Sequence, residues 1–224
     1  IKILKNRVDL ISGKLRDEIL YEAKKRNKKV IIFDDGLQDR NISFDIKIVC
    51  FDSDNTIGNG LLIPAGPLRE RINSLSNYDC VILKGENKDT KKFIKKIRRI
   101  NKNLRIFTTY FKVKNFYKLN RLNKYIIFSG IGNPKNFKKT LLKNKIKVIH
   151  EFIFPDHHNY TSNEIKNIKQ IADKKNAKII TTEKDFVKLS SIDQKKIDYL
   201  KVETKFQNEK KFINYLKSKM YEKY

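Results

Sequence analysis

VIIFDDGLQDR, residues 30–40, is the stretch that points most clearly to a fold. It starts with a short run of apolar residues and continues directly with two carboxylates, Asp34 and Asp35. A continuous apolar run is typical of a strand that helices cover on both faces. In α/β sheets, ligands bind beyond the carboxyl ends of such strands. The stretch therefore predicts a strand at Lys29–Phe33 that carries an acidic pair to the ligand-binding edge of a sheet.

The acidic pair itself has two interpretations. In phosphate-binding ATPases, an acid after an apolar strand holds Mg²⁺ directly or through water. The same residues also suit a helix cap or an Asx turn, with Gly36 ending the strand. This stretch alone does not decide between the two.

Patterns typical of strands and helices alternate along nearly the whole chain. We expect strands at Lys29–Phe33, Asp45–Phe51, Asp79–Leu83, Arg105–Tyr110, Tyr125–Ser129, Lys147–Phe152 and Ala177–Thr182. We expect helices at Lys14–Arg26, Thr90–Asn101, Pro134–Asn144, Ser162–Lys175 and Glu209–Lys223. Several of the strands are continuous apolar runs, so the predicted class is α/β, with mostly parallel sheets and covering helices.

The chain length of 224 residues allows one large domain or two small ones. Segment Phe107–Lys124 is polar and aromatic and has no helical period, so we expect a linker at 107–124 between domains at 1–106 and 125–224. Cys50 and Cys80 lie in apolar runs, which indicates buried thiols in a reducing compartment. The sequence has no apolar run of the roughly 18 to 20 residues that a membrane-spanning helix needs.

The net charge of +26 raises the question of an anionic partner. The excess comes from 41 Lys against 10 Arg, and it is spread along a chain rich in Ile and Asn, as an AT-rich genome would encode. Arg, which reads bases with two hydrogen bonds, is not enriched, and we expect no nucleic acid partner. An anionic membrane or an anionic substrate fits better. Thr90–Asn101 is either a crossover helix with a solvated basic face or, if the substrate is a lipid, a helix resting on anionic lipid.

A second loop rich in glycine and proline, GNGLLIPAGPLRERINSL, spans residues 58–75. It presents Asn59, Arg69 and Glu70, and function tends to lie on such loops when a rigid scaffold holds them. Arg69 can bind a phosphate with two hydrogen bonds, and Glu70 can bind Mg²⁺ or support one of its ligands. The alternative is an ordered turn with an exposed ion pair.

Three further motifs follow predicted strands: SGIGNP at 129–134, FIFPDHHNYTSNEI at 152–165 and IITTEKDFVKL at 179–189. In the second, Asp156 precedes His157 and His158, and a carboxylate beside an imidazole suits proton transfer. Zinc needs three or four ligands, and two adjacent His do not supply them. We therefore expect acid–base chemistry here and no His-bound metal.

These five motifs occur in one order between Val30 and Leu189, and together they resemble the tetraacyldisaccharide 4'-kinases of lipid A synthesis. Members of that family pass the γ-phosphate of ATP to the 4'-hydroxyl of a membrane lipid. The resemblance implies a P-loop-kinase-like three-layer unit, incomplete here, and a second, smaller α/β unit joined by a short β linker. It also implies ATP and Mg²⁺, an acylated disaccharide phosphate as acceptor, and a cytoplasmic protein peripheral on the inner membrane.

The resemblance assigns roles to the first two motifs. Asp34 and Asp35 correspond to the paired acids that bind Mg–ATP, and Asp35 also takes part in catalysis. Arg69 is expected to contact ATP and the acceptor, Asn59 the acceptor, and Glu70 the metal.

Roles for the Asp-His-His motif follow in the same way. His157 is expected to assist a catalytic aspartate that the family carries nearer its N-terminus, and Asp156 to orient His157 or contact the metal–phosphate cluster. His158 is expected on the substrate side or in the packing. A plain capped turn before Ser162–Lys175 remains an alternative for all three.

Two departures from the family pattern are visible. The loop G-x-x-x-x-G-K-[ST] is absent from these residues, and the sequence begins at Ile1 without Met. We therefore expect an N-terminally truncated chain that is inactive by itself. The family's D-D-G-F-Q-H has Leu37 and Asp39 here, which leaves the role of position 39 open. The alternative function is a non-catalytic basic module that binds nucleic acid or anionic membrane.

Overall fold

The computed structural model describes residues 8–13, 15–39, 41–85 and 90–221. The chain divides into two compact units. We call residues 11–112 with 204–224 the N-terminal unit, and residues 113–203 with 1–10 the C-terminal unit. The sequence had placed the last residues of the chain in the domain 125–224, whereas they cluster with 11–112 in the structure. The boundary after Lys112 lies inside the predicted linker 107–124.

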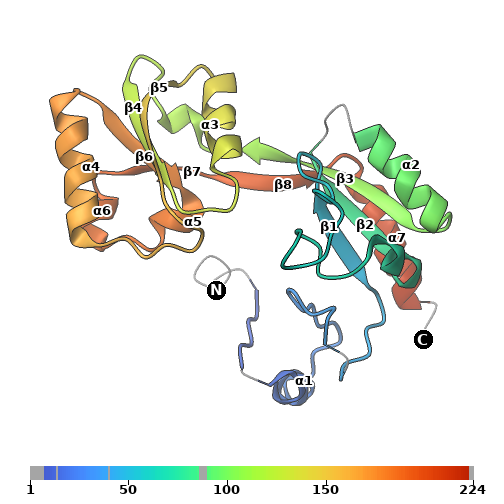
Figure 1. Ribbon diagram of the computed structural model, residues 1–224. Coiled ribbons are helices and arrows are strands. Elements are labelled where there is room, and N and C mark those ends of the chain that lie inside the picture. Colours follow the sequence, from blue (N-terminus) through green and yellow to red (C-terminus); the bar gives the residue numbers. More distant parts are fainter. Residues whose placement is uncertain (1–7, 14, 40, 86–89, 222–224) are drawn as a thin grey trace. The chain divides into compact units, whose positions relative to one another are not determined.

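The N-terminal unit is built on a four-stranded sheet in the order β1-β2-β3-β8 (Figure 1). The strands are β1 (Ile48–Asp52), β2 (Cys80–Lys84), β3 (Arg105–Val113) and β8 (Val202–Phe206). β1, β2 and β3 are parallel neighbours. The helical elements are α1 (Arg16–Lys25), η1 (Ile72–Asn77), α2 (Thr90–Ile100) and α7 (Glu209–Tyr221).

Helices cover both faces of this sheet, because its apolar side chains alternate between the faces. On one face, Phe93 of α2 packs edge-on against Phe51 of β1, with 5.1 Å between ring centroids. Phe51 is in register with Leu83 of β2, whereas Phe107 is in register with Ile82, the residue before it. Because successive side chains of a strand point to opposite faces, Phe107 belongs to the other face. Its ring lies 5.1 Å from that of Phe212 on α7. The unit is therefore three-layered, as expected.

The C-terminal unit contains a second sheet, all of whose described pairings are parallel, in the order β5-β4-β6-β7. The strands are β4 (Lys124–Ser129), β5 (Lys147–Ile153), β6 (Lys178–Thr182) and β7 (Asp198–Leu200). The helices are α3 (Pro134–Lys143), α4 (Ser162–Lys174), α5 (Glu183–Phe186) and α6 (Ser191–Gln194), and η2 (Phe116–Lys118) precedes β4.

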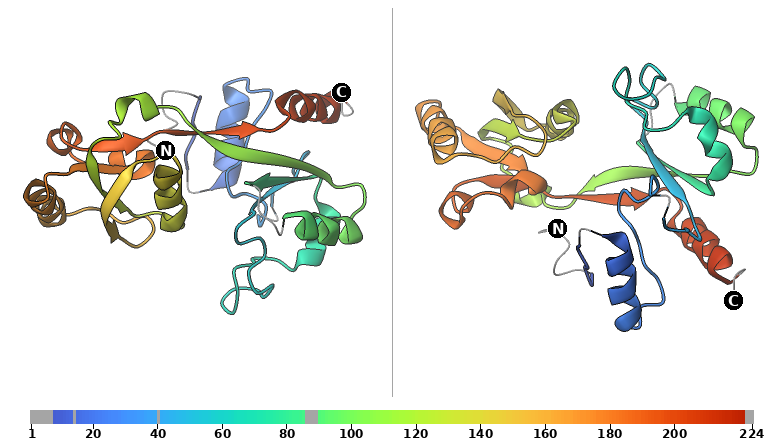
Figure 2. Two further views of the ribbon diagram at one scale, coloured as in Figure 1. Left: turned by 90° about the horizontal axis from the view of Figure 1, so that it is seen from above. Right: turned by 60° about the horizontal axis from the view of Figure 1, so that its bottom comes forward.

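The central strand β4 is buried on both faces, which explains its unbroken apolar sequence. Tyr125 and Ile127 belong to one core with α3, and Ile126 and Phe128 to another with α4. The two helices consequently lie on opposite faces of the sheet (Figure 2). The predicted α/β class with mostly parallel sheets is confirmed.

One predicted strand is wrong. Residues 29–33 form no strand, and Val30 and Ile32 are 55% and 90% exposed. A strand needs a neighbour to accept its backbone hydrogen bonds, and none of the described strands pairs with this segment. Asp34 and Asp35 therefore follow a loop segment and not a strand. Lys14 and Lys223, at the ends of two predicted helices, lie outside the described residues.

Candidate functional site

The carboxyl edge of the C-terminal sheet brings three of the sequence motifs together. β4, β5 and β6 are parallel, so the loops that follow them leave the sheet at one edge. SGIGNP starts at the last residue of β4, the Asp-His-His motif follows β5, and TTEKD spans the end of β6 and the start of α5. Asn133 caps α3 by accepting from the N–H of Asn136, and Thr161 and Glu164 form a capping box on α4. These caps fix where each loop ends and its helix begins.

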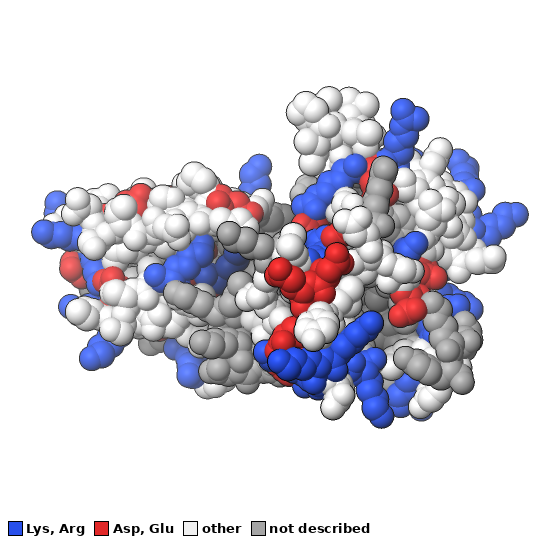
Figure 3. Space-filling model, turned by 90° about the horizontal axis from the view of Figure 1, so that it is seen from below, with Lys and Arg blue, Asp and Glu red and all other residues white. Residues whose placement is uncertain are grey.

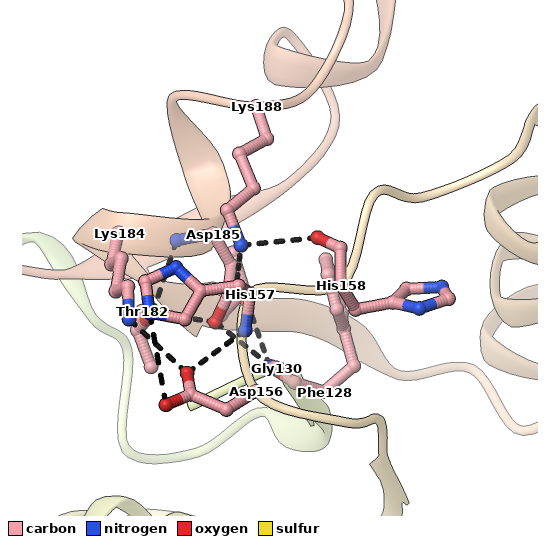
Figure 4. Close-up of polar contacts among 10 residues, drawn as sticks. Phe128, Gly130, Asp156, His157, His158, Thr182, Lys184, Asp185 and Lys188 are labelled. Atoms are coloured by element: carbon pink, nitrogen blue, oxygen red, sulfur yellow. Dashed lines mark hydrogen bonds and ion pairs between the residues drawn. The ribbon is translucent and has the colours of Figure 1, made fainter. Parts of the chain in front are cut away.

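Asp185 is the buried centre of this edge (Figure 4). Its carboxylate accepts hydrogen bonds from the Gly130 N–H at 3.1 Å and from the Thr182 hydroxyl at 2.7 Å. The Lys188 ammonium lies 3.2 Å from its other oxygen and also donates to the His158 carbonyl at 3.0 Å. The carboxylate is thus linked to the loop after β4, to the end of β6 and, through Lys188, to the loop after β5.

Asp156 and His157 form the exposed part of the site. The Lys184 ammonium lies 3.1 Å from Asp156 Oδ1, and the His157 N–H donates to the same oxygen at 2.9 Å. Partial burial by itself raises the pKa of Asp156, but these hydrogen bonds outweigh it and the net pKa is lowered. His157 Nε2 is 3.9 Å from Asp156 Oδ2, and the side chain is 77% exposed. The predicted pair is therefore brought together, with the imidazole free to meet another group.

The His158 ring points away from the His157 ring (Figure 4). Its ring stacks on Phe154 with centroids 4.7 Å apart, and its Nε2 lies 3.1 Å from both carboxylate oxygens of Glu164. The Thr161 N–H and His158 lower the pKa of Glu164. Of the two places expected for His158, the structure favours the packed one.

A second cluster lies in the N-terminal unit. Arg69 pairs with Asp35 through a short hydrogen bond, and Arg16 donates to the Asp35 carbonyl at 2.9 Å and to the Asp39 carboxylate at 3.0 Å. The hydrogen bond from Arg69 lowers the pKa of Asp35. Asp39 therefore has a place in this cluster, as the partner of Arg16. Asp34, next in the chain, is exposed.

Glu70 joins this cluster through Gln38. Its carboxylate accepts from the Gln38 amide at 3.3 Å and from the Tyr78 hydroxyl at 3.0 Å, and the Gln38 carbonyl lies 3.4 Å from Arg69. Burial, together with Glu70, raises the pKa of Tyr78 to about 12, so the hydroxyl remains a donor at neutral pH.

Asn59 is engaged within its own loop. Its amide donates to the Ala65 carbonyl at 2.8 Å, and its Oδ1 accepts from the Leu61 N–H at 3.1 Å. A Cβ on Gly66 would lie 2.2 Å from that oxygen and 2.4 Å from the Leu61 carbonyl oxygen. Position 66 therefore requires glycine if the loop is to keep this shape.

Asp34 and Asp35 are the candidate metal donors of the N-terminal unit. Within the described ranges, no group of three or more His, Cys, Asp or Glu side chains is placed to hold an ion. Mg²⁺ does not require such a cage, because it commonly binds one or two carboxylates and keeps waters and substrate phosphates as its other ligands. Exposed carboxylates at Asp34 and Asp35 fit this type of binding.

The face in Figure 3 carries charges of both signs. On the face in Figure 3, Lys and Arg are spread widely and Asp and Glu lie among them. The described helices include none that is long and apolar enough to cross a membrane.

Sequence reasoning named no individual residue of TTEKD as part of the site. The available signal was the Thr-x-x-Asp spacing, which is typical of a helix cap, with Lys188 three positions further on. The link from Asp185 to Gly130 depends on the order of the strands, and a local motif does not contain that information.

Comparison with known proteins identifies the family to which the sequence is similar. Residues 5–221 match the profile of LpxK, tetraacyldisaccharide-1-P 4'-kinase. The tetraacyldisaccharide 4'-kinase of Pelagibacter ubique is 40% identical over 215 residues, which are 96% of this chain and 68% of that protein. The enzymes of Rickettsia bellii and Rickettsia canadensis are 36% and 40% identical over 84% and 73% of this chain, and over 57% and 49% of their own lengths.

A solved structure of LpxK from Aquifex aeolicus, described as an "apo" form in complex with ATP, shares the fold. It matches with a TM-score of 0.61 and 23% identity, over 90% of this chain and 61% of that one. The chain thus spans about half to two thirds of the length of these relatives. The profile match over residues 5–221 and the 40% identity show that this chain belongs to the tetraacyldisaccharide-1-P 4'-kinase family.

Proposed function

We propose that the complete protein transfers the γ-phosphate of ATP to the 4'-hydroxyl of a tetraacyldisaccharide 1-phosphate in lipid A synthesis. The observation that carries the proposal is the family match over residues 5–221. The site geometry supports it, because the family-like motifs gather into two clusters with complementary chemistry. One cluster offers carboxylates and Arg69 for a metal-bound phosphate, and the other offers an exposed imidazole beside a carboxylate.

The first cluster suits the nucleotide. Asp34 and Asp35 would hold Mg²⁺, with Glu70 close by, and the ion would neutralise phosphate charge when bound. Arg69 neutralises Asp35 in the structure. When a polyphosphate and its cation bind, Arg69 can pair with the phosphates and Asp35 with the cation.

The second cluster suits the acceptor. A sugar hydroxyl is a weak nucleophile, and a base that receives its proton can contribute about 10²- to 10⁴-fold to the rate. We assign His157 to assist this proton transfer and Asp156, held by Lys184, to orient the imidazole. Because the Asn59 amide and His158 Nε2 already have partners, these residues would support the acceptor mainly by shaping the loops that carry Arg69 and His157.

The acceptor's acyl chains imply a membrane surface as the place of reaction. We propose that the protein is cytoplasmic and peripheral on the inner membrane, where its net charge of +26 favours anionic lipid. The exposed basic residues of α2 are one source of this attraction, since Phe93 and Ile97 of the same helix are buried in the core.

The test is transfer of labelled γ-phosphate from ATP to purified tetraacyldisaccharide 1-phosphate by the protein from the complete reading frame that contains this chain. We expect a single product phosphorylated at the 4' position. Asp35→Ala should lower kcat by about 10² or more, because charge placement dominates phosphoryl transfer. A folded protein that transfers no phosphate but binds RNA or anionic vesicles tightly would instead indicate a basic binding module.

A further inference from the structure

The buried carboxylate of Asp185 has more partners than a helix cap needs. Its side chain is 0% exposed, and a buried carboxylate is costly unless it is paired and hydrogen-bonded. Capping α5 requires only that Thr182 accepts from the Asp185 N–H, at 3.2 Å. The carboxylate itself faces three donors, from Gly130, Thr182 and Lys188. Its burial is therefore explained by the chain segments it connects and not by the short helix α5 to which it belongs.

The partners of Asp185 and Lys188 lie on three separate segments of the chain. Gly130 begins the loop after β4, and Thr182 ends β6. Lys188 extends the connection to the loop after β5, because its ammonium also donates to the His158 carbonyl at 3.0 Å. Asp185 and Lys188 together thus join three chain segments that are distant in the sequence.

The joined loops are packed so closely that the turn at His157 depends on them. The His157 N–H lies 3.3 Å from the Gly130 carbonyl, and His157 has the left-handed backbone conformation, with φ of 63°. A non-glycine residue adopts this conformation at an energetic cost, which the surroundings must compensate. A Cβ on Gly130 would lie only 3.0 Å from the Pro155 carbonyl oxygen. Movement of the Gly130 loop would consequently disturb the turn.

We propose that Asp185 and Lys188 are positioning residues that hold the Asp156–His158 turn in the conformation that directs His157 outward and His158 inward. The meaning of this for catalysis rests on the proposed function, whereas the geometry and its first test do not. The competing explanation is a local cap of α5 with no influence on the turn.

The chain provides a matched control in Asp193. Ser190 caps α6 by accepting from the Asp193 N–H at 3.2 Å, its hydroxyl donates to the Asp193 carboxylate at 2.6 Å, and Asp193 also pairs with Lys169. Asp193 therefore repeats the cap and the lysine partner of Asp185, and its side-chain partners Ser190 and Lys169 lie at the start of α6 and on α4. Asp193→Asn removes the same charge from the same unit without touching the three loops.

The first test uses Asp185→Asn and Asp193→Asn in the 224-residue chain, followed by NMR. In Asp185→Asn we expect the Gly130 and His157 amides to exchange with solvent about tenfold faster or more, and the imidazole signals of both His157 and His158 to move. In Asp193→Asn these signals should stay in place. Equal effects of the two substitutions, or unmoved His157 and His158 signals in Asp185→Asn, would overturn the proposal.

A second pair of variants covers the case in which Asp185→Asn does not fold. Lys188→Met removes the donor to the His158 carbonyl, while Lys188→Arg keeps a positive donor. We expect Lys188→Met to move the His157 and His158 signals and Lys188→Arg largely to restore them. The same movement in both variants, or in neither, would contradict the proposal.

In the complete enzyme, the two Lys188 variants should differ in turnover. Lys188→Met should lower kcat about tenfold or more with little change in the KM for ATP, and Lys188→Arg should regain most of the rate. A loss of thermal stability with unchanged kcat would mean a purely structural role. If the NMR signals move as expected but neither the wild type nor any variant transfers phosphate, the proposed function is wrong and the positioning role is still supported.

Discussion

The ion pair between Arg69 and Asp35 shows how a single contact reports on the proposed site. Both side chains are more than half exposed, so the pair contributes little to the free energy of unfolding. It does affect protonation, because Arg69 lowers the pKa of Asp35. The folded protein therefore keeps this carboxylate charged to a lower pH than the unfolded chain. Any stability from the pair is present above the ordinary Asp pKa of about 3.9 and is lost as the pH falls through the folded value.

Arg69→Met should raise the pKa of Asp35 toward its ordinary value. The carboxyl carbon of Asp35 can be followed by NMR as the pH is lowered, and its titration midpoint should be higher in the variant than in the wild type. Arg71→Met, which removes the same charge two positions away, should move it less. An unchanged midpoint in Arg69→Met would show that the pair is not formed in solution.

Among the helices and strands, α4 has a start that is fixed by a complete capping box. Thr161 and Glu164 satisfy each other's backbone N–H groups in a capping box. Thr161→Ala should cost about 1 kcal/mol of unfolding free energy, because it leaves the N–H of Glu164 without its acceptor. Hydrogen exchange of the α4 amides measures this loss.

The control substitution is Thr140→Ala in α3. Its hydroxyl donates to the Asn136 carbonyl inside the helix, and such a bond does not stabilise a helix. Because alanine is the better helix former, Thr140→Ala should be neutral or slightly stabilising. Equal losses of unfolding free energy in the two variants would mean that the capping box does not stabilise α4.

The elements that could be predicted are those with their own periodic pattern. β4 and α4 agree with their predicted bounds to within a residue. β7 has three residues and α5 four, too short to show a period, and neither was predicted. The segment 29–33 failed for the opposite reason, since it has the composition of a strand but no partner in the described sheets.

For the site, local pairs were predictable and distant ones were not. Asp156 and His157 are neighbours in the sequence, so their proximity needed no fold. Asp185 and Gly130 are 55 residues apart and meet because β4 and β6 lie side by side.

For the molecule as a whole, the decisive fact is that 224 residues span about half to two thirds of their relatives. The ATP phosphates in P-loop kinases are held by the backbone N–H groups and the Lys of a G-x-x-x-x-G-K-[ST] loop. These residues contain no such loop. In a sample of these 224 residues alone, the carboxylates of Asp34 and Asp35 and the guanidinium of Arg69 would act without that cradle.

The 224-residue chain by itself should therefore bind Mg–ATP weakly. Isothermal titration should give no saturable signal, or a Kd no tighter than about 0.1 mM. Titration of the protein from the complete reading frame is the matched comparison, and it should bind more tightly. Submicromolar affinity of the 224-residue chain would contradict this account of the nucleotide site.

The turnover of His157→Ala and His158→Ala in the complete enzyme decides whether the Asp156–His157 turn serves phosphoryl transfer. His157 is exposed and His158 is packed against Phe154 and Glu164, so the two substitutions should act differently. His157→Ala should lower kcat by about 10²- to 10⁴-fold and change the KM for ATP little. His158→Ala should have the milder effect on kcat. Full turnover of His157→Ala, or a larger loss in His158→Ala, would contradict the role assigned to this turn.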